Sequence, residues 1–478
     1  SGQAGDLEGA VAATAELLAD RVRVLGADHP DTLSARHEWA RWQGRAGNAA
    51  GAVAATTELL ADRVRVLGPD HPDTLSTRHG LAWWRGEAGD AAGAVAAFAD
   101  LLADRQRLLG PDHPHTLTTR QELGHWQGEA GDTAGAVATL EVLLPDHERV
   151  LGPQHPRTLS TRQELAHWRG VGGDRTGTVA ALAQLAAERA RILGPDHPDS
   201  LTARSDHASW LVATGDPTGA LAAEAGVLAD ALRVLGPDHP DTLAIRANAA
   251  ATTGVAGDPA GARRAYGELL ADHLRILGPQ HPDTLGIRAN AAHWRGVGGD
   301  PSGAAAELAE LLADRTRVLG GDHPHTLATR GRAAHWTGVA GDPGRAASLL
   351  ADLLADRTRL LGPDHPHTLA TRGNLAYWRG AAGDPAGAAA LFTALLDDAV
   401  RLLGADAPDT LAVLHNLAHW RTAAGDPVGA KAAATHLAAL LPAVGPHATH
   451  SITIAGSLTR WTADQDLPGR AGVPPAIR

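Results

Sequence analysis

Residues 361–402 read LGPDHPHTLATRGNLAYWRGAAGDPAGAAALFTALLDDAVRL, and the same pattern returns every 42 residues along the chain. Its Leu-Gly start recurs without any insertion at Leu25, Leu67, Leu109, Leu151, Leu193, Leu235, Leu277, Leu319, Leu361 and Leu403. Self-similarity at a fixed period is the sequence signature of a repeat architecture. One structural unit, repeated ten times over residues 25–444, therefore makes up most of the 478-residue chain.

Each unit contains the start and stop signals of two helices. In the first unit, Pro30 suits the first position of a helix, where a missing N–H costs nothing, and Gly47 ends that helix at about residue 46. Asn48, which is Asp in the other nine units, is a good N-cap for a second helix over 49–67. Two antiparallel helices per unit, stacked in series, predict an all-α fold, an α-solenoid of ten helix–turn–helix repeats. No strand pattern is visible in the sequence.

The pattern resembles the tetratricopeptide repeat, in the 42-residue form of kinesin light chains and of many bacterial signalling proteins. The resemblance is carried by the HPDTL entry, the run Asn374-Leu375-Ala376, Gly383 between the helices, Ala388 and Phe392 on the second helix, and the LG-PDHP linker. The chain departs from the family pattern at Arg379 and its equivalents, which replace a tyrosine, and at Arg372, which replaces a large apolar residue. The resemblance implies a superhelix whose first helices line a concave groove.

The repeat boundaries predict four parts. We expect an N-terminal half-repeat over 1–24 that holds a second helix only, ten repeats over 25–444, a capping helix over 445–463 with Trp461, and a flexible tail over 464–478. Because the chain opens in the middle of a unit and contains no Met, we expect it to belong to a longer polypeptide. Similar arrays in bacterial signalling proteins imply an upstream NTPase or effector domain.

Positions that repeat in every unit predict contacts of the scaffold. Tryptophan occupies the position of Trp42 in nine of ten units, and Thr252 is the exception. Such a column predicts a tryptophan spine that packs each repeat on the next, in preference to an aromatic ladder for sugars or bases, and Thr252 predicts a weak point or bend. The nine arginines equivalent to Arg36 are expected to pair with a linker Asp or a carbonyl. The nine histidines equivalent to His29 predict capped turns, since they lack the geometry and further ligands of a zinc site.

The composition excludes several classes of function. The net charge is −12, whereas a nucleic-acid partner requires a basic surface. Because the chain has no Cys, disulfides, thiolate catalysis and Cys-ligated metals are excluded. No run approaches the ~18 apolar residues of a membrane span, and no signal peptide is visible. These observations predict a cytoplasmic protein that binds neither nucleic acid nor membranes.

An enzyme is not expected. The sequence has no Walker loop, nucleophile elbow, HExxH motif or isolated carboxylate pair. One active site needs singular residues, and a tenfold repeat supplies equivalent ones. We therefore predict no catalytic residue, no cofactor and no metal ligand.

The candidate ligand-binding residues lie where the first helix varies from unit to unit, because a variable position is free to serve a ligand. On the face that the resemblance makes concave, they are His37, Glu38, Arg41, His79, Trp83, Glu122, His125, Glu164, His167, Asp206, Asn248, Asn290, His293, Arg332, His335, Asn374, Tyr377, Asn416 and His419. In the resembled family, an Asn at the position of Asn248, Asn290, Asn374 and Asn416 clamps the backbone of a bound peptide. The recurring histidines suggest the further hypothesis that titration near neutral pH tunes binding.

The sequence thus predicts a non-catalytic solenoid that binds a protein or peptide segment along its concave face, as the sensor or scaffold part of a larger bacterial signalling protein. The alternative is an intramolecular regulatory or oligomerisation module of a signalling NTPase or transcription regulator. An ordinary solvated helix face is the plain interpretation of the same variable positions.

Overall fold

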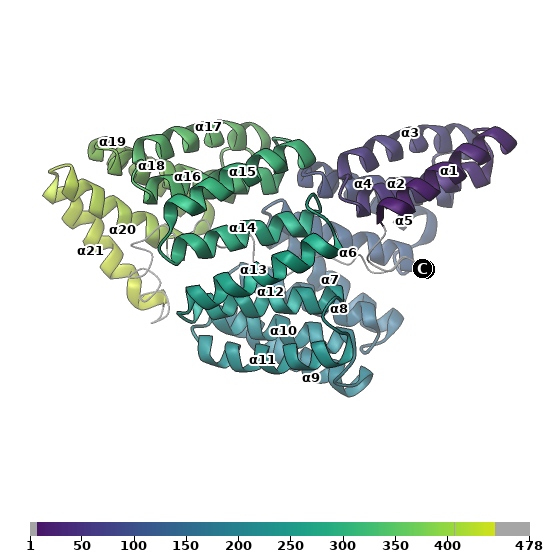
Figure 1. Cartoon of the computed structure of the whole chain (residues 1–478), viewed down its shortest axis with the longest axis horizontal. Helices are drawn as coiled ribbons and strands as arrows, with labels where there is room; N and C mark the ends of the chain where they lie inside the picture. The colour runs from purple at the N-terminus through teal and green to yellow at the C-terminus, as the bar shows by residue number, and fades with distance from the viewer. Residues whose placement is uncertain (1–6, 406, 445–478) are drawn as a thin grey trace. The chain divides into compact units, whose positions relative to one another are not determined.

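A computed structural model describes residues 7–405 and 407–444 of the chain, and these residues form helices only (Figure 1). The elements are α1 (Leu7–Leu25), α2 (Pro30–Arg45), α3 (Ala49–Leu67), α4 (Pro72–Glu87), α5 (Ala91–Leu109), α6 (Pro114–Glu129), α7 (Thr133–Leu151), α8 (Pro156–Val171), α9 (Arg175–Leu193), α10 (Pro198–Ala213), α11 (Pro217–Val234), α12 (Pro240–Val255), α13 (Pro259–Ile276), α14 (Pro282–Val297), α15 (Pro301–Leu319), α16 (Pro324–Val339), α17 (Pro343–Leu361), α18 (Pro366–Ala381), α19 (Pro385–Leu403), α20 (Pro408–Ala423) and α21 (Pro427–Val444). Even-numbered helices are the first helices of the repeats, and odd-numbered helices from α3 on are the second helices. The predicted all-α solenoid of helix–turn–helix repeats is confirmed. The expected capping helix over 445–463 and the tail over 464–478 lie outside the described residues.

Capping hydrogen bonds and a glycine define the helix ends at the predicted start and stop residues. At the start of α2 the Nδ1 atom of His29 accepts a hydrogen bond from the backbone N–H of Asp31 at 3.2 Å. At the start of α3 the side chain of Asn48 accepts from the N–H of Gly51 at 2.9 Å. Gly68 ends α3 with a φ of 90°, a left-handed conformation that a side chain disfavours. The predicted capping roles of the histidine and Asn/Asp positions are therefore confirmed here.

The tryptophan spine joins consecutive repeats through a glycine. Trp378 on α18 is buried and its ring packs on Gly338 of α16, where a Cβ would lie 2.5 Å from two ring carbons. The same arrangement pairs Trp84 with Gly44, Trp126 with Gly86, Trp168 with Gly128, Trp210 with Gly170, Trp294 with Gly254, Trp336 with Gly296 and Trp420 with Gly380. Each ring therefore occupies space that only a glycine in the preceding repeat leaves free, and the predicted packing role of the tryptophans is confirmed.

Where the tryptophan spine is interrupted, both the tryptophan and its partner glycine are replaced. Thr252 replaces the tryptophan in the sixth repeat, and Val212 stands at the equivalent of the glycine in the fifth. Thr252 is buried, so the smaller side chain still belongs to the core. Within the described residues, the chain divides into two compact units next to this position: residues 7–252 with 268–284, and residues 253–267 with 285–444. The same division also cuts α13 between Gly267 and Glu268, and the weak point at Thr252 stays a prediction.

A second interaction between repeats uses a buried arginine. Arg63 near the end of α3 donates hydrogen bonds to the carbonyl oxygen of Asp73 at 2.9 Å and to the hydroxyl of Thr77 at 2.7 Å, both on α4. Burial lowers the pKa of the Arg63 guanidinium. Where Ala231 replaces this arginine, Ile245 replaces the threonine, and the two side chains share one apolar cluster. Both positions change together at this junction, whereas Ala203 and Ile287 stand at the threonine position of junctions that keep a polar residue, Arg189 and His273.

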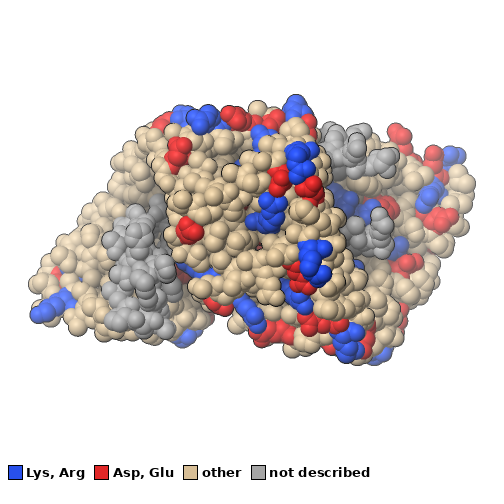
Figure 2. Space-filling model, turned by 90° about the horizontal axis from the view of Figure 1, so that it is seen from below, with Lys and Arg blue, Asp and Glu red and all other residues tan. Residues whose placement is uncertain are grey.

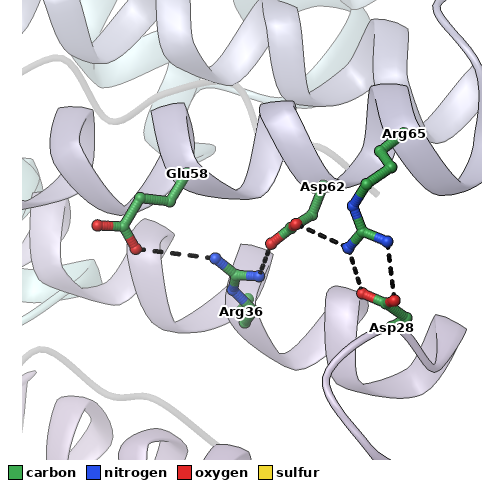
Figure 3. A network of polar contacts seen from close by, with 5 residues as sticks. All are labelled: Asp28, Arg36, Glu58, Asp62 and Arg65. Carbon is green, nitrogen blue, oxygen red and sulfur yellow. Dashed lines mark hydrogen bonds and ion pairs between the residues drawn. The ribbon is translucent and has the colours of Figure 1, made fainter.

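In the first nine repeats, an ion pair connects the first helix with the second, as Figure 3 shows for the first repeat. Arg36 contacts Asp62 at 2.5 Å and Glu58 at 3.8 Å, and Arg65 joins Asp62 at 2.9 Å and Asp28 at 2.5 Å. The hydrogen bond from Arg36 is the largest of the causes that lower the pKa of Asp62. The linker Asp28 thus pairs with Arg65, and the expectation that Arg36 binds it was wrong. Because opposite charges are interspersed, the face in Figure 2 shows acidic and basic residues side by side.

Replacing Pro145 by alanine is expected to raise the free energy of unfolding by about 2–3 kcal/mol, measured by urea denaturation. Pro145 lies inside α7, where it removes a backbone hydrogen bond and crowds the preceding turn. Alanine occupies the equivalent position in eight other repeats, among them Ala103 and Ala187, so the replacement suits this backbone. An unchanged or lower stability would contradict the prediction.

Candidate ligand-binding face

The nineteen predicted ligand-binding residues lie on one face of the first helices, which we call the first-helix face. It is formed by the positions equivalent to 37, 38, 41 and 45 of α2. First helices of neighbouring repeats contact each other directly, as α2 does with α4, α6 with α8, α16 with α18 and α18 with α20. Side chains at these positions therefore reach from one repeat to the next.

Most of these residues are less accessible than an open groove would make them. Seven are buried: Glu122, Glu164, Asn248, Asn290, Arg332, His335 and Asn374. Eleven are half-buried: His37, Glu38, Arg41, His79, Trp83, His125, His167, Asp206, His293, Tyr377 and Asn416. His419, on α20, is exposed. The face thus combines contacts between repeats with a narrower accessible surface.

Hydrogen bonds explain much of this burial in the unit that contains residues 7–252. The carboxylate of Glu164 on α8 contacts the Gln121 amide at 3.2 Å and Nδ1 of His125 at 3.1 Å, both on α6. Gln163 likewise donates to Asp206 on α10. Each of these contacts links one first helix to the next, so the acidic residues of this unit bind neighbouring repeats.

Two of the four asparagines predicted as peptide clamps are engaged in the same way. The Asn248 amide donates to the hydroxyl of Ser205 at 3.0 Å, and the Asn290 amide oxygen accepts from Arg332 at 3.3 Å. Asn416 donates to the carbonyl oxygen of Ala412 within its own helix at 2.9 Å. Asn374 is buried on α18. The predicted clamp position is therefore also a structural position of the repeat junctions.

The rings of the first-helix face form a continuous row with the tryptophan spine. In the unit that contains residues 285–444, His293 lies 5.1 Å from Trp294 and 5.8 Å from Trp336 between ring centroids. His335 and Tyr377 occupy the same place in the next two repeats, each between two tryptophans. Edge-to-face geometry prevails in these pairs, and it is a favourable arrangement of aromatic side chains.

Burial changes the expected titration of these histidines. It lowers the pKa of His293 and of His335 to about 4, because a charged imidazole loses its hydration there. We therefore predict that both rings stay neutral between pH 8 and 5.5, which NMR titration of the imidazole resonances can test. A folded-state pKa below the unfolded value means that stability falls as the pH drops from about 6.5 towards 4. Protonation of either ring near pH 6.5 would restore the hypothesis of a neutral-pH sensor at these two positions.

One buried carboxyl group on this side of the repeats escaped the sequence analysis. Glu224 on α11 is 1% exposed and contacts the hydroxyl of Ser205 at 3.2 Å and that of Ser209 at 3.3 Å. The pKa of Glu224 is raised to about 8, mainly by burial and in small part by the nearby Asp206, against the hydrogen bonds from Ser205 and Ser209, which lower it. The signal was present in the sequence, because Leu182 and Tyr266 stand at the equivalent positions of the adjacent repeats.

A second missed feature is a row of exposed valines at the carboxyl ends of first helices. Val255, Val297 and Val339 end α12, α14 and α16 and are 55%, 42% and 45% exposed. Glu87 and Glu129 occupy the equivalent positions in the second and third repeats and are exposed as well. The accessible edge of the first-helix face is therefore acidic in the second and third repeats and apolar from the fourth repeat on, where Val171 is 51% exposed.

An open hollow of about 460 Å³ lies between α20 and α21 and is lined by His415, Ala418, His419, Thr422, Pro427, Ala430, Lys431 and Ala434.

In the described residues, no group of three or more His, Asp or Glu side chains is arranged to hold a metal ion. Among the helices so described, none is both long and apolar enough to cross a membrane.

The family comparison agrees with the repeat pattern. The model of the tetratricopeptide repeat matches residues 2–31, 32–73, 74–115, 200–241, 242–283 and 326–367, which together are half of the chain. No curated protein matches the chain.

Three solved structures have a similar fold. A Podosopora anserina protein, described as a kinesin light chain with nearly identical TPR-like repeats, is 22% identical, with 52% of this chain and 97% of that chain covered and a TM-score of 0.32. BtubC (BKLC) from P. vanneervenii is 21% identical, with 47% and 90% covered and a TM-score of 0.41. A Rap protein complexed with competence and sporulation factor is 12% identical, with 78% and 99% covered and a TM-score of 0.48.

Proposed function

The chain belongs to the tetratricopeptide repeat family, and from this premise we propose that it is a non-catalytic scaffold that binds a protein or peptide segment along its first-helix face. The observation that carries the proposal is the change of accessible residues along this face, from Glu87 and Glu129 to Val297 and Val339, on helices whose packing positions repeat. A solenoid needs only its repeated positions to stack. Exposed positions that vary in chemistry are the ones that serve recognition.

The proposal includes a role as the sensor or scaffold part of a larger bacterial signalling protein, in which an upstream NTPase or effector domain responds to the bound segment.

Site-specific photo-crosslinking tests where a partner binds. A crosslinker is placed at Glu129 or Ala381, which are exposed on first helices, and in matched controls at Val142 or Thr316, which are exposed on second helices. Each bait is irradiated in lysate of the source organism, and adducts are identified by mass spectrometry. One partner crosslinked from the first helices and not from the second supports the proposal. A partner crosslinked only from Val142 or Thr316, or none from any bait, contradicts it.

A further inference from the structure

We infer that the valine row, defined as Val255, Val297 and Val339, binds an uncharged, extended segment that carries an apolar side chain at every third residue. The inference rests on the proposed function and adds the chemical class of the ligand. Its basis is the exposure, the charge and the spacing of residues in the unit that contains residues 253–267 and 285–444.

The valine row exposes apolar side chains at the ends of three first helices. Its three side chains are about half exposed, although they end helices whose other apolar residues, such as Ala292 and Ala334, are buried. Ala381 and Ala423 continue the row on α18 and α20 and are exposed too. Apolar side chains at one exposed position of five consecutive repeats form a row, and apolar surface grouped in this way is a feature of interaction sites.

The charge of this part of the face selects an uncharged partner. From α14 to α20, the positions equivalent to 37, 38, 41 and 45 contain one formally charged residue, Arg332. Arg332 is buried and donates to Asn290. The nearby Arg295 and Arg379 are held by Asp300 and Asp384, at 2.6 and 2.7 Å. A charged ligand would lose hydration over the valines without gaining a counter-ion from this row.

The spacing of the repeats sets the spacing of the ligand side chains. Packed helices lie about 8–10 Å apart, and His293 on α14 contacts Trp336 on α16, so these two first helices are direct neighbours. A polyproline II chain has three residues per turn and rises about 3.1 Å per residue, so every third side chain returns to one face after about 9 Å. One apolar side chain per repeat therefore matches one valine per first helix.

The aromatic row beside the valines favours the same ligand. Val297 and Val339 lie one helical turn after His293 and His335, and His293 and Tyr377 are half-buried, so ring edges border the apolar strip. Pro-rich segments dock on aromatic surfaces because their polyproline II conformation is formed before binding, which lowers the entropy lost on association. The inferred ligand is thus a Pro-containing segment and not an amphipathic helix, whose apolar side chains would be spaced at three and four residues.

The test uses a fluorescein-labelled peptide of four Pro-Ser-Val triplets and a shuffled peptide of the same composition with the valines in one block. Binding to the whole chain is followed by fluorescence anisotropy. We expect the regular peptide to bind at least tenfold more tightly than the shuffled one. We also expect the double variant Val297→Ser/Val339→Ser to weaken the regular peptide at least tenfold. Val428→Ser, at an 80% exposed position on α21, is the matched control and should change affinity less than twofold.

Three results would overturn the inference: equal binding of both peptides, no binding of either, or binding that the double variant leaves unchanged. Sedimentation velocity tests whether a second copy of the chain covers the valine row instead. A dimer of the wild type that is absent in the double variant would mean that it does. Circular dichroism confirms that each variant is folded. If the crosslinked partner is still captured by the double variant, the inferred ligand class fails while the proposed function stands. If no bait captures a partner, the proposed function fails whatever the peptides do.

Discussion

Replacing Trp378 by threonine is expected to lower the free energy of unfolding by about 3–5 kcal/mol, since it removes a buried ring and leaves a cavity between two repeats. Replacing Gly338 by valine is expected to cost at least about 1–3 kcal/mol, because the new Cβ lies 2.5 Å from two carbons of the Trp378 ring. The double variant copies the pair formed by Val212 and Thr252 in the natural interrupted junction. It should therefore be more stable than the sum of the two losses predicts, by about 1–3 kcal/mol.

Urea denaturation of the four proteins closes the double-mutant cycle. An exposed valine on the same unit, Val428→Thr, controls for the general effect of a surface substitution. Additive losses would mean that the glycine and the tryptophan do not act as a pair, and the interrupted junction would then need another explanation. Because a repeat array unfolds through its junctions, a second, earlier transition in either single variant would locate the damage at this junction.

Replacing Glu224 by glutamine is expected to stabilise the protein by up to about 3 kcal/mol at pH 7 and to do so much less at pH 4.5. The folded-state pKa of Glu224 is raised to about 8, so the folded protein holds a proton that the unfolded chain releases above about pH 4.5. The stabilisation that the wild-type protein gains from protonated Glu224 is therefore fully present at low pH, and it is lost as the pH rises towards 8. Glutamine keeps an uncharged acceptor beside Ser205 and Ser209 and has no proton to lose.

The measurement is the free energy of unfolding of wild type and variant between pH 6.5 and 8.5, a range above the titration of the buried histidines. Glu310→Gln, at an exposed position on α15, is the control and should leave the slope with pH unchanged. A wild-type stability that does not fall over this range, or a variant that falls in parallel with it, would show that the Glu224 carboxyl is already ionised in the folded protein.

Much of the fold was predictable because its signals are local. Pro30, Gly47 and Asn48 mark helix ends through backbone preferences that act within a few residues, and the 42-residue period placed them in all ten repeats. The tryptophan spine was predictable from its period, but its glycine partner was not singled out, because the contact joins residues 40 positions apart in adjacent repeats. The choice between Asp28 and Asp62 as the partner of Arg36 also needed the three-dimensional arrangement.

The candidate site was harder to predict because variability has two causes. Glu164 varies between repeats because its partners Gln121 and His125 vary with it, whereas Val297 varies on an open surface. The sequence argument treated both kinds of position as free. Complementary pairs in adjacent repeats, such as Gln121 and Glu164, were the signal that separates them. The exposure of the first-helix face still depends on how closely the helices pack, which periodicity alone does not determine.

The glycine that accepts each tryptophan also limits how the gene for such an array can change length. At most positions in the array, deleting one whole repeat by unequal recombination brings a tryptophan against the glycine of another repeat. The tryptophan spine then re-forms. Deleting residues 235–276 instead would set Trp294 against Val212, and deleting residues 193–234 would leave Gly170 facing Thr252. One product has a steric clash and the other a void. We therefore expect changes in repeat number to occur on either side of the interrupted junction and not at the two repeats that form it.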